Sequence, residues 1–310
     1  MKDWELPVLY PREEKKITSK AGWALFLLLF ATAAVQLGID ALVNWRAPQL
    51  ADNLYYLWLS ALIPQYCIGY PLAIYILCKL PKYSIPQSSL ERKGKWRLFL
   101  ICYSVLIFGS LLGSAVNGGL ETVFGINTDL AMDVLMQQSS LLLVFLVAVV
   151  LGPVAEEFVF RKLLLDRFVK YGEFPAVMTS GIIFGLYHGN FEQFFYAMFV
   201  GWIFAYIYVK TGKIRYSIAL HMLINFMGSA LPLYIFRVNS YFLLMLYSLA
   251  VLLFIVTGAV YAVRSRKSWR CRPADFALTP AEGAKIIWLN PGMTAAAVCI
   301  LAFFYIGVFM

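Results

Sequence analysis

The chain has 310 residues, of which 61% are hydrophobic and 14% are charged, and its mean hydropathy is +0.73. Soluble domains carry about 25% charged residues, so this composition excludes an ordinary soluble protein and indicates a polytopic membrane protein. The formal net charge of +9 does not require a nucleic-acid partner, because lysine and arginine gather on the cytoplasmic side of membrane proteins and face anionic lipid there. We therefore expect membrane lipid as a partner, and no nucleic acid.

Nine apolar stretches run along the chain, and about 20 apolar residues are enough to cross a hydrocarbon core of about 30 Å. The fifth stretch is short. We expect an all-α, polytopic transmembrane helical bundle of about eight or nine spans, with a cytoplasmic N-terminal arm at 1–20 and a single transmembrane domain at 21–310. In chain order, the stretches lie near 21–43, 54–80, 98–116, 139–165, 174–188, 191–209, 214–236, 241–263 and 286–310.

Basic residues divide the connections between these stretches into two sets. Of the 26 lysines and arginines, all but Arg46 and Arg237 lie in the first twenty residues or at the second, fourth, sixth and eighth connections. Cytoplasmic connections carry such an excess of positive charge. The N-terminus is therefore expected in the cytoplasm, and nine spans would place the C-terminus on the other side.

The fourth stretch contains charged residues that are flanked by apolar residues on both sides, in "LGPVAEEFVFRK" (Leu151 to Lys162). Proline supplies no N–H and clashes with the preceding turn, so a kink or a loosened turn is expected near Pro153. Residues four apart share a helix face, so Glu157 and Arg161 are expected to form an ion pair. Glu156 would point about 100° away around the same helix and stay free for another role.

Both histidines of the chain lie in apolar stretches. His188 ends "FGLYH", and His221 begins "HMLIN", in which Asn225 lies one turn later on the same helix face. Ionisable side chains within a membrane span are costly and usually functional. At about 1.5 Å per helical residue, Glu156 and His188 lie at similar depths below the cytoplasmic connections, and His221 is shallower. We expect these groups to form one site.

Two kinds of chemistry fit this set of side chains. A carboxylate and an imidazole that converge on water form a general-base pair, while a second imidazole and an amide can donate hydrogen bonds to an oxyanion. Alternatively, Glu156, His188 and His221 could be the ligands of one divalent metal such as zinc. An HExxH motif is missing, and no serine or cysteine lies in a nucleophile motif, although Ser180 and Ser229 stay open as nucleophiles. The cofactor is therefore either none or one metal ion.

Three motifs, which lie in apolar stretches that contain polar residues, resemble those of a known family. The segment "EEFVFR" (Glu156 to Arg161) is similar to an EExxxR motif, "FGLYH" (Phe184 to His188) to FxxxH, and "HMLIN" (His221 to Asn225) to HxxxN/D. They occur in the order found in the CPBP membrane proteases, also called the CAAX protease and bacteriocin-processing, or Abi, family, which includes enzymes like the type II CAAX prenyl endopeptidases. No motif that we can match lies in the first 138 residues or in the last 70.

This resemblance implies an intramembrane endopeptidase, a hydrolase of the glutamate type, with a catalytic core at about 139–236. The implied substrates are membrane-associated or prenylated proteins, or peptides. Metal dependence stays open, so the term metalloprotease is one of two alternatives. In the family's terms, Glu156 and His188 activate the attacking water, His221 and Asn225 stabilise the oxyanion, and Glu157 and Arg161 support the site.

Two other functions are compatible with the same residues. A transporter would also place charges beside a Gly-Pro break at mid-membrane, although it would more naturally have two related halves, and none is visible in the sequence. A non-catalytic immunity or regulatory membrane protein would not need the complete motif set. The short connections between the apolar stretches, and the usual location of members of this family, favour the plasma membrane of a bacterium.

Overall fold

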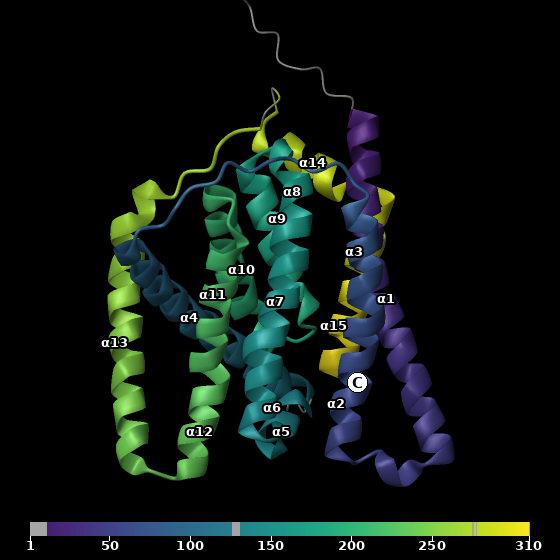
Figure 1. Cartoon of the computed structure of the whole chain (residues 1–310), viewed down its shortest axis with the longest axis vertical. Coiled ribbons are helices and arrows are strands. Elements are labelled where there is room, and N and C mark those ends of the chain that lie inside the picture. Colours follow the sequence, from purple (N-terminus) through teal and green to yellow (C-terminus); the bar gives the residue numbers. More distant parts are fainter. Residues whose placement is uncertain (1–10, 126–130, 275, 277, 310) are drawn as a thin grey trace, which may run out of the picture.

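The computed structural model describes residues 11–125, 131–274, 276 and 278–309, and every regular element among them is helical, with no strand (Figure 1). Three single 3₁₀ turns and four π-helical turns connect or interrupt the helices. The π-helical turns are Pro64–Gly69, Phe145–Leu151, Phe158–Leu163 and Phe226–Ala230. The helices are α1 (Pro11–Arg46), α2 (Leu54–Ile63), α3 (Tyr70–Cys78), α4 (Arg92–Phe124), α5 (Ala131–Gln138), α6 (Leu141–Val144), α7 (Gly152–Glu157), α8 (Leu164–Phe168), α9 (Glu173–Tyr187), α10 (Phe191–Thr211), α11 (Ile214–Asn225), α12 (Leu231–Val238), α13 (Tyr241–Ser265), α14 (Pro280–Trp288) and α15 (Pro291–Phe309).

Seven helical segments of the described chain are long and apolar enough to cross a membrane, and α14 and α15 together form an eighth that is bent by 75°. The all-α polytopic bundle expected from the sequence is therefore confirmed. The fifth expected stretch, near 174–188, is not among these segments, because α9 has only 15 residues and a length of about 22 Å, too short to cross the hydrocarbon core. Most of α9 is buried, so it is a central helix of the bundle.

The helices begin and end at residues that satisfy their free backbone groups. Asn190 accepts a hydrogen bond from the backbone N–H of Gln193 at 2.8 Å and begins α10, and Thr279 forms a capping box with Glu282 at the start of α14. Gly212 ends α10 with φ of +60°, a conformation that costs glycine no steric strain. The expected arm at 1–20 is helical from Pro11 onward, and residues 1–10 lie outside the described chain.

The N-terminal arm and the four expected basic connections meet at one end of the bundle, the upper end in Figure 1. The backbone N–H of Tyr83 donates to the carbonyl oxygen of Asp166 at 2.7 Å, and the N–H of Ser88 donates to that of Thr211 at 2.9 Å. Arg46 ends α1 at the opposite end. The charge asymmetry of the sequence therefore corresponds to two ends of the folded bundle, as the positive-inside rule requires.

Buried ion pairs hold this basic end together. Lys170 pairs with Glu14, and both side chains are largely buried. Glu173 pairs with Lys210 and also accepts a hydrogen bond from Nε of Arg272 at 2.6 Å. Burial alone would raise the pKa of Glu173, but these hydrogen bonds and the charge of Lys210 outweigh it and lower the pKa. The acidic residues of this end are thus used to join segments that are far apart in sequence.

Helix α10 lies at the centre of the bundle and packs closely against both α4 and α9. Small residues permit the approach: a Cβ atom added to Gly109 of α4 would lie 2.5 Å from Cα of Tyr196 in α10. Likewise, a Cβ atom on Gly181 of α9 would lie 2.1 Å from Cδ1 of Trp202. Contacts this close require glycine, so these two positions fix the spacing of the three helices that surround the polar residues.

The first and last described helices pack side by side. The hydroxyl of Thr18 in α1 donates to the carbonyl oxygen of Ile286 at 2.8 Å, and the N–H of Gly292 donates to Oγ of Ser19 at 2.9 Å. A Cβ atom on Gly22 would lie 2.2 Å from the backbone of Gly292, so the two helices touch through their main chains. This contact joins α1 to α15 along the bundle.

Candidate active site

The fourth span is a broken helix. Its order is α6, the π-helical turn Phe145–Leu151, α7, the π-helical turn Phe158–Leu163 and α8. The loosened turn expected near Pro153 is therefore present, and a second one follows the glutamates. A π-helical turn contains one residue more than an α-helical turn, so it rotates the residues beyond it around the helix axis. The short α7 carries Glu156 and Glu157 between the two turns.

Glu157 and Arg161 form the ion pair expected from their spacing. Nε of Arg161 lies 3.2 Å from Oε2 of Glu157, and both side chains are completely buried. The other oxygen of Glu157, Oε1, lies 3.1 Å from Nδ1 of His221 in α11. A carboxylate oxygen accepts hydrogen bonds, so Nδ1 of His221 carries the proton and donates it to Glu157. Glu157 thus connects the fourth span to α11.

Aromatic rings enclose the guanidinium of Arg161. Its central carbon lies 4.3 Å from the ring centre of Phe184 and 5.7 Å from that of Phe204, within the range of cation–π attraction. None of its nitrogen atoms has a well-aligned hydrogen-bond acceptor among the described residues. Gly201 lies against this group, since a Cβ atom there would lie 3.0 Å from Cδ1 of Phe184 and 3.5 Å from Arg161 Nη2. Arg161 therefore depends on Glu157 for its opposite charge.

Four of the six predicted site residues line one cavity of about 430 Å³ between the helices; they are Glu156, His188, His221 and Asn225. Glu157 and Arg161 do not line it. The side chain of Glu156 is 18% exposed, and its Oε2 lies 3.8 Å from Nε2 of His221. The structure therefore separates the two adjacent glutamates, one facing a cavity and one buried in an ion pair.

His188 follows the last residue of α9 and folds back onto that helix. Its Nδ1 lies 2.7 Å from the carbonyl oxygen of Phe184, four residues earlier. A carbonyl oxygen only accepts, so Nδ1 carries the proton, and in the neutral ring Nε2 has a free lone pair. Gly189 then turns the chain with φ of +71°, and Asn190 donates to the carbonyl oxygen of His188 at 2.8 Å. These contacts fix the orientation of the imidazole.

Asn225 ends α11 and joins it to the fourth span. Its amide Nδ2 donates to the carbonyl oxygen of Ala148 at 2.8 Å, and Ala148 belongs to the π-helical turn Phe145–Leu151. An amide nitrogen carries two hydrogen atoms, so one of them stays available to another acceptor. The hydroxyl of Ser229 donates to the carbonyl oxygen of Asn225 at 2.6 Å. Asn225 is thus held from two sides at the edge of the cavity.

Other polar residues of the cavity wall were not predicted from the sequence. Gln65 lines the cavity and donates to the hydroxyl of Tyr187 at 3.2 Å, beside His188. Gln65 follows Pro64 inside an apolar stretch, and such a polar residue within a span is a signal that could have marked it. Of the two serines left open, Ser229 lines the cavity, whereas Ser180 donates to the carbonyl oxygen of Phe160 at 2.9 Å and does not line it.

The alternative metal site can be tested on the donor atoms. Among the described residues, no three histidine, cysteine, aspartate or glutamate side chains are grouped as the ligands of a metal ion. Nδ1 of His221 donates to Glu157 and Nδ1 of His188 to a backbone carbonyl, so these two contacts leave both Nε2 atoms free and do not by themselves decide between the alternatives. Glu156, His188 and His221 are not grouped as a ligand set in the described part of the chain, and we derive no step through a metal.

Comparison with known proteins points to one class of protein. A family model described as type II CAAX prenyl endopeptidase Rce1-like matches residues 138–227, the segment that contains all three motifs. The segment that forms the cavity is thus similar to the CAAX, or CPBP, protease family.

One curated relative extends the similarity. The Bacillus subtilis (strain 168) protein named "Putative membrane peptidase YdiL" is 29% identical over 157 residues, which cover 48% of this chain and 62% of the relative. The aligned part thus spans less than two thirds of that protein's length. No solved structure matches the chain.

Proposed function

We propose that this protein is an intramembrane endopeptidase that hydrolyses peptide bonds with a water molecule activated by Glu156. One observation supports this most strongly: Glu156, His188, His221 and Asn225 come from three separate segments of the chain and line a single cavity. They supply a carboxylate, two imidazoles and an amide, which together can perform the proton transfers and the charge stabilisation of amide hydrolysis.

The first step needs a water molecule that loses a proton as it attacks. In this proposal, the water donates one hydrogen bond to the carboxylate of Glu156 and one to the lone pair on Nε2 of His188. Glu156 takes the proton while the water oxygen bonds to the carbonyl carbon of the scissile amide. The carbonyl oxygen becomes an oxyanion that accepts a hydrogen bond from the second amide hydrogen of Asn225. His221 supplies another donor when both of its ring nitrogens carry protons.

The second step breaks the carbon–nitrogen bond. The tetrahedral intermediate collapses, and the proton held by Glu156 moves to the leaving nitrogen, so that the products are a carboxylic acid and an amine. Glu156 returns to its carboxylate form, and no covalent enzyme intermediate is formed. Glu157 and Arg161 do not touch the substrate in this scheme; they hold His221 and α7 in position.

We place the substrates among membrane-associated or prenylated proteins, or peptides, and the enzyme in the plasma membrane of a bacterium. The description of the matching family model and the name and source of the bacterial relative support this proposal. The cavity also suits a membrane substrate, because it lies inside a bundle whose described segments are long enough to span the bilayer.

Purified full-length protein in detergent tests the proposal against a transporter or a non-catalytic regulator. We expect new peptide termini by mass spectrometry when a library of peptides or the membrane proteome is added, without an ion gradient, and none with Glu156→Gln. Activity that needs sealed vesicles and a gradient, with no new termini, would favour a transporter. The absence of both activities, together with specific capture of a membrane protein, would favour a regulator.

A further inference from the structure

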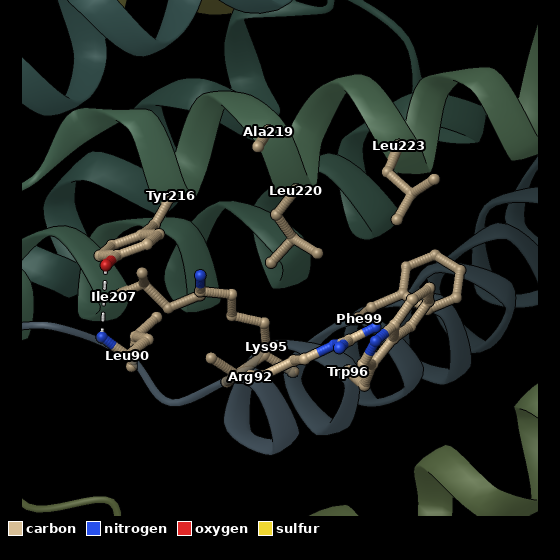
Figure 2. A pocket seen from close by; sticks show the side chains of 11 residues that line it. Leu90, Arg92, Lys95, Trp96, Phe99, Ile207, Tyr216, Ala219, Leu220 and Leu223 are labelled. Atoms are coloured by element: carbon tan, nitrogen blue, oxygen red, sulfur yellow. Dashed lines mark hydrogen bonds between the residues drawn. The ribbon is translucent and has the colours of Figure 1, made fainter.

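A second cavity lies at the basic end of the bundle, between the start of α4 and the first turns of α11 (Figure 2). Its volume is about 270 Å³. Figure 2 shows Tyr216, Leu220 and Leu223 of α11 on one side and Lys95, Trp96 and Phe99 of α4 on the other. We call this cavity the α4–α11 groove. None of the predicted site residues lines it.

The wall of the α4–α11 groove is mostly apolar, but two basic side chains, Arg92 and Lys95, also line it. Phe99 and Leu220 are nearly buried and form its floor, whereas Arg92 and Lys95 are exposed. Nζ of Lys95 lies 5.2 Å from the ring centre of Tyr216. The groove therefore combines an apolar surface with fixed positive charge at the cytoplasmic end of two spans.

These two cations have no counter-charge in the described part of the chain. Neither Arg92 nor Lys95 belongs to any of its ion pairs, and no acidic side chain lines the groove. Lys170 and Lys210, at the same end of the bundle, instead pair with glutamates. A ligand that brings negative charge and an apolar chain would complement both properties.

We propose that the α4–α11 groove binds one anionic phospholipid, with an acyl chain against Phe99, Leu220 and Leu223 and the phosphate beside Arg92 and Lys95. Basic pockets between transmembrane helices at the cytoplasmic side bind anionic head groups for this reason. A zwitterionic lipid carries its own cation and gains less from the two basic side chains. Free phosphate gains nothing from the apolar wall.

The position of the groove connects it to the proposed active site. Leu220 and Leu223 lie on one face of α11, while His221 and Asn225 lie on the face that lines the larger cavity. Leu220 and Ile224 also belong to the same buried cluster as Phe99 and Ile207. A lipid in the groove therefore packs against the back of the helix that carries His221, and its binding stabilises the packing of α11 by mass action.

Native mass spectrometry of the delipidated full-length protein tests this binding. Phosphatidylglycerol and phosphatidylcholine with identical acyl chains would be titrated separately, with glycerol 3-phosphate as a probe that lacks the chains. We expect one tightly bound phosphatidylglycerol, at least tenfold weaker binding of phosphatidylcholine, and no binding of glycerol 3-phosphate at the same concentrations. Equal binding of the two lipids, or of glycerol 3-phosphate and phosphatidylglycerol, would overturn the proposal.

Two sets of variants locate the lipid. Arg92→Gln with Lys95→Gln should weaken phosphatidylglycerol about thirtyfold, since each cation near an anionic lipid contributes about fivefold. The matched control, Lys16→Gln with Lys20→Gln, removes two exposed charges from the same end on α1, and we expect less than a twofold change. Equal weakening in both pairs would reduce the effect to general surface charge and refute a specific site.

Ala219 provides a test that keeps both cations. It lines the groove and is exposed, so Ala219→Phe would fill the groove without entering the core. We expect at least tenfold weaker phosphatidylglycerol binding and an unchanged unfolding temperature without lipid. We also expect the lipid to raise the unfolding temperature of the wild type and not that of Ala219→Phe. Undiminished binding in Ala219→Phe would show that the lipid lies elsewhere.

Discussion

Nδ1 of His221 donates a hydrogen bond to Oε1 of Glu157 across 3.1 Å, and both side chains are buried. This contact orients the imidazole, because the remaining nitrogen, Nε2, then faces the cavity. It also gives the two adjacent glutamates different roles. Glu157 positions another residue, and Glu156 is the carboxylate that a substrate or a water molecule can reach.

Replacing Glu156 by glutamine should remove activity and keep the fold. The amide has the same shape but cannot take a proton from water, so we expect turnover to fall by at least about 100-fold. Glu156 faces a cavity and forms no ion pair with a lysine or arginine in the described chain, so the unfolding temperature should change little. Peptide cleavage and thermal unfolding in detergent measure the two quantities. Turnover above a few per cent of wild type would remove Glu156 from the role of base.

Replacing Glu157 by glutamine should cost stability as well as activity. Arg161 is completely buried, and leaving a buried charge without its partner typically costs about 3–5 kcal/mol. We therefore expect a clear loss of unfolding free energy, in contrast to Glu156→Gln. Adding Arg161→Met to Glu157→Gln should recover much of this loss, because the unpaired charge is then absent. Equal stability of the two single glutamine variants would contradict this division of roles.

Asn225 provides a test of oxyanion stabilisation. We expect Asn225→Ala to lower turnover by about 100- to 1000-fold with little change in substrate affinity, as is typical for the loss of one oxyanion donor. Ser229→Ala is the matched control, because Ser229 also lines the cavity but donates to the backbone of its own segment. A similar loss of turnover in both variants, or a change in affinity alone, would argue against this role for Asn225.

Metal content distinguishes the two mechanisms left open by the sequence. We predict that purified active protein contains well under one equivalent of zinc by elemental analysis, because Glu156, His188 and His221 are not grouped as a ligand set among the described residues. Strong chelators should then leave activity unchanged. Stoichiometric zinc that disappears together with activity in His188→Ala would establish the metal-dependent alternative and keep the protease assignment.

The ion pairs of Glu173 predict a dependence of stability on pH. The folded protein lowers the pKa of Glu173, so this carboxylate stabilises the fold above its ordinary pKa, and that contribution disappears as the pH falls through the folded pKa. We expect the unfolding temperature to fall from neutral to acid pH and Glu173→Gln to flatten this profile. Parallel profiles for the two proteins would exclude Glu173 as the cause.

Much of the site followed from local spacing. The four-residue interval between Glu157 and Arg161 was enough to predict their ion pair, and the apolar surroundings of the only two histidines were enough to place them in one site with Glu156. The class of fold and the common end of the basic connections followed from hydropathy and charge. These predictions need only the spacing of residues, their hydropathy and charge, and the known geometry of a helix, and the first three can be read from the sequence.

Other features could not be read from local spacing. A π-helical turn differs from an α-helical turn by one residue, and the second such turn of the fourth span, Phe158–Leu163, contains no residue type that marks it. The short stretch near 174–188 matches α9 in length, but only the tertiary structure shows that most of this helix is buried at the centre of the bundle. The proton positions on His188 and His221 depend on acceptors that only tertiary structure supplies.

The contact between α1 and α15 has a consequence for biosynthesis. During translation, α1 enters the membrane with its glycine-containing face uncovered, and that face receives its partner only after α14 and α15 have been made. Thr18 likewise obtains its acceptor, the carbonyl oxygen of Ile286, only at that stage. This contact therefore forms only after α15 has been made, and an arrested chain that ends before α14 would leave this face of α1 without its partner.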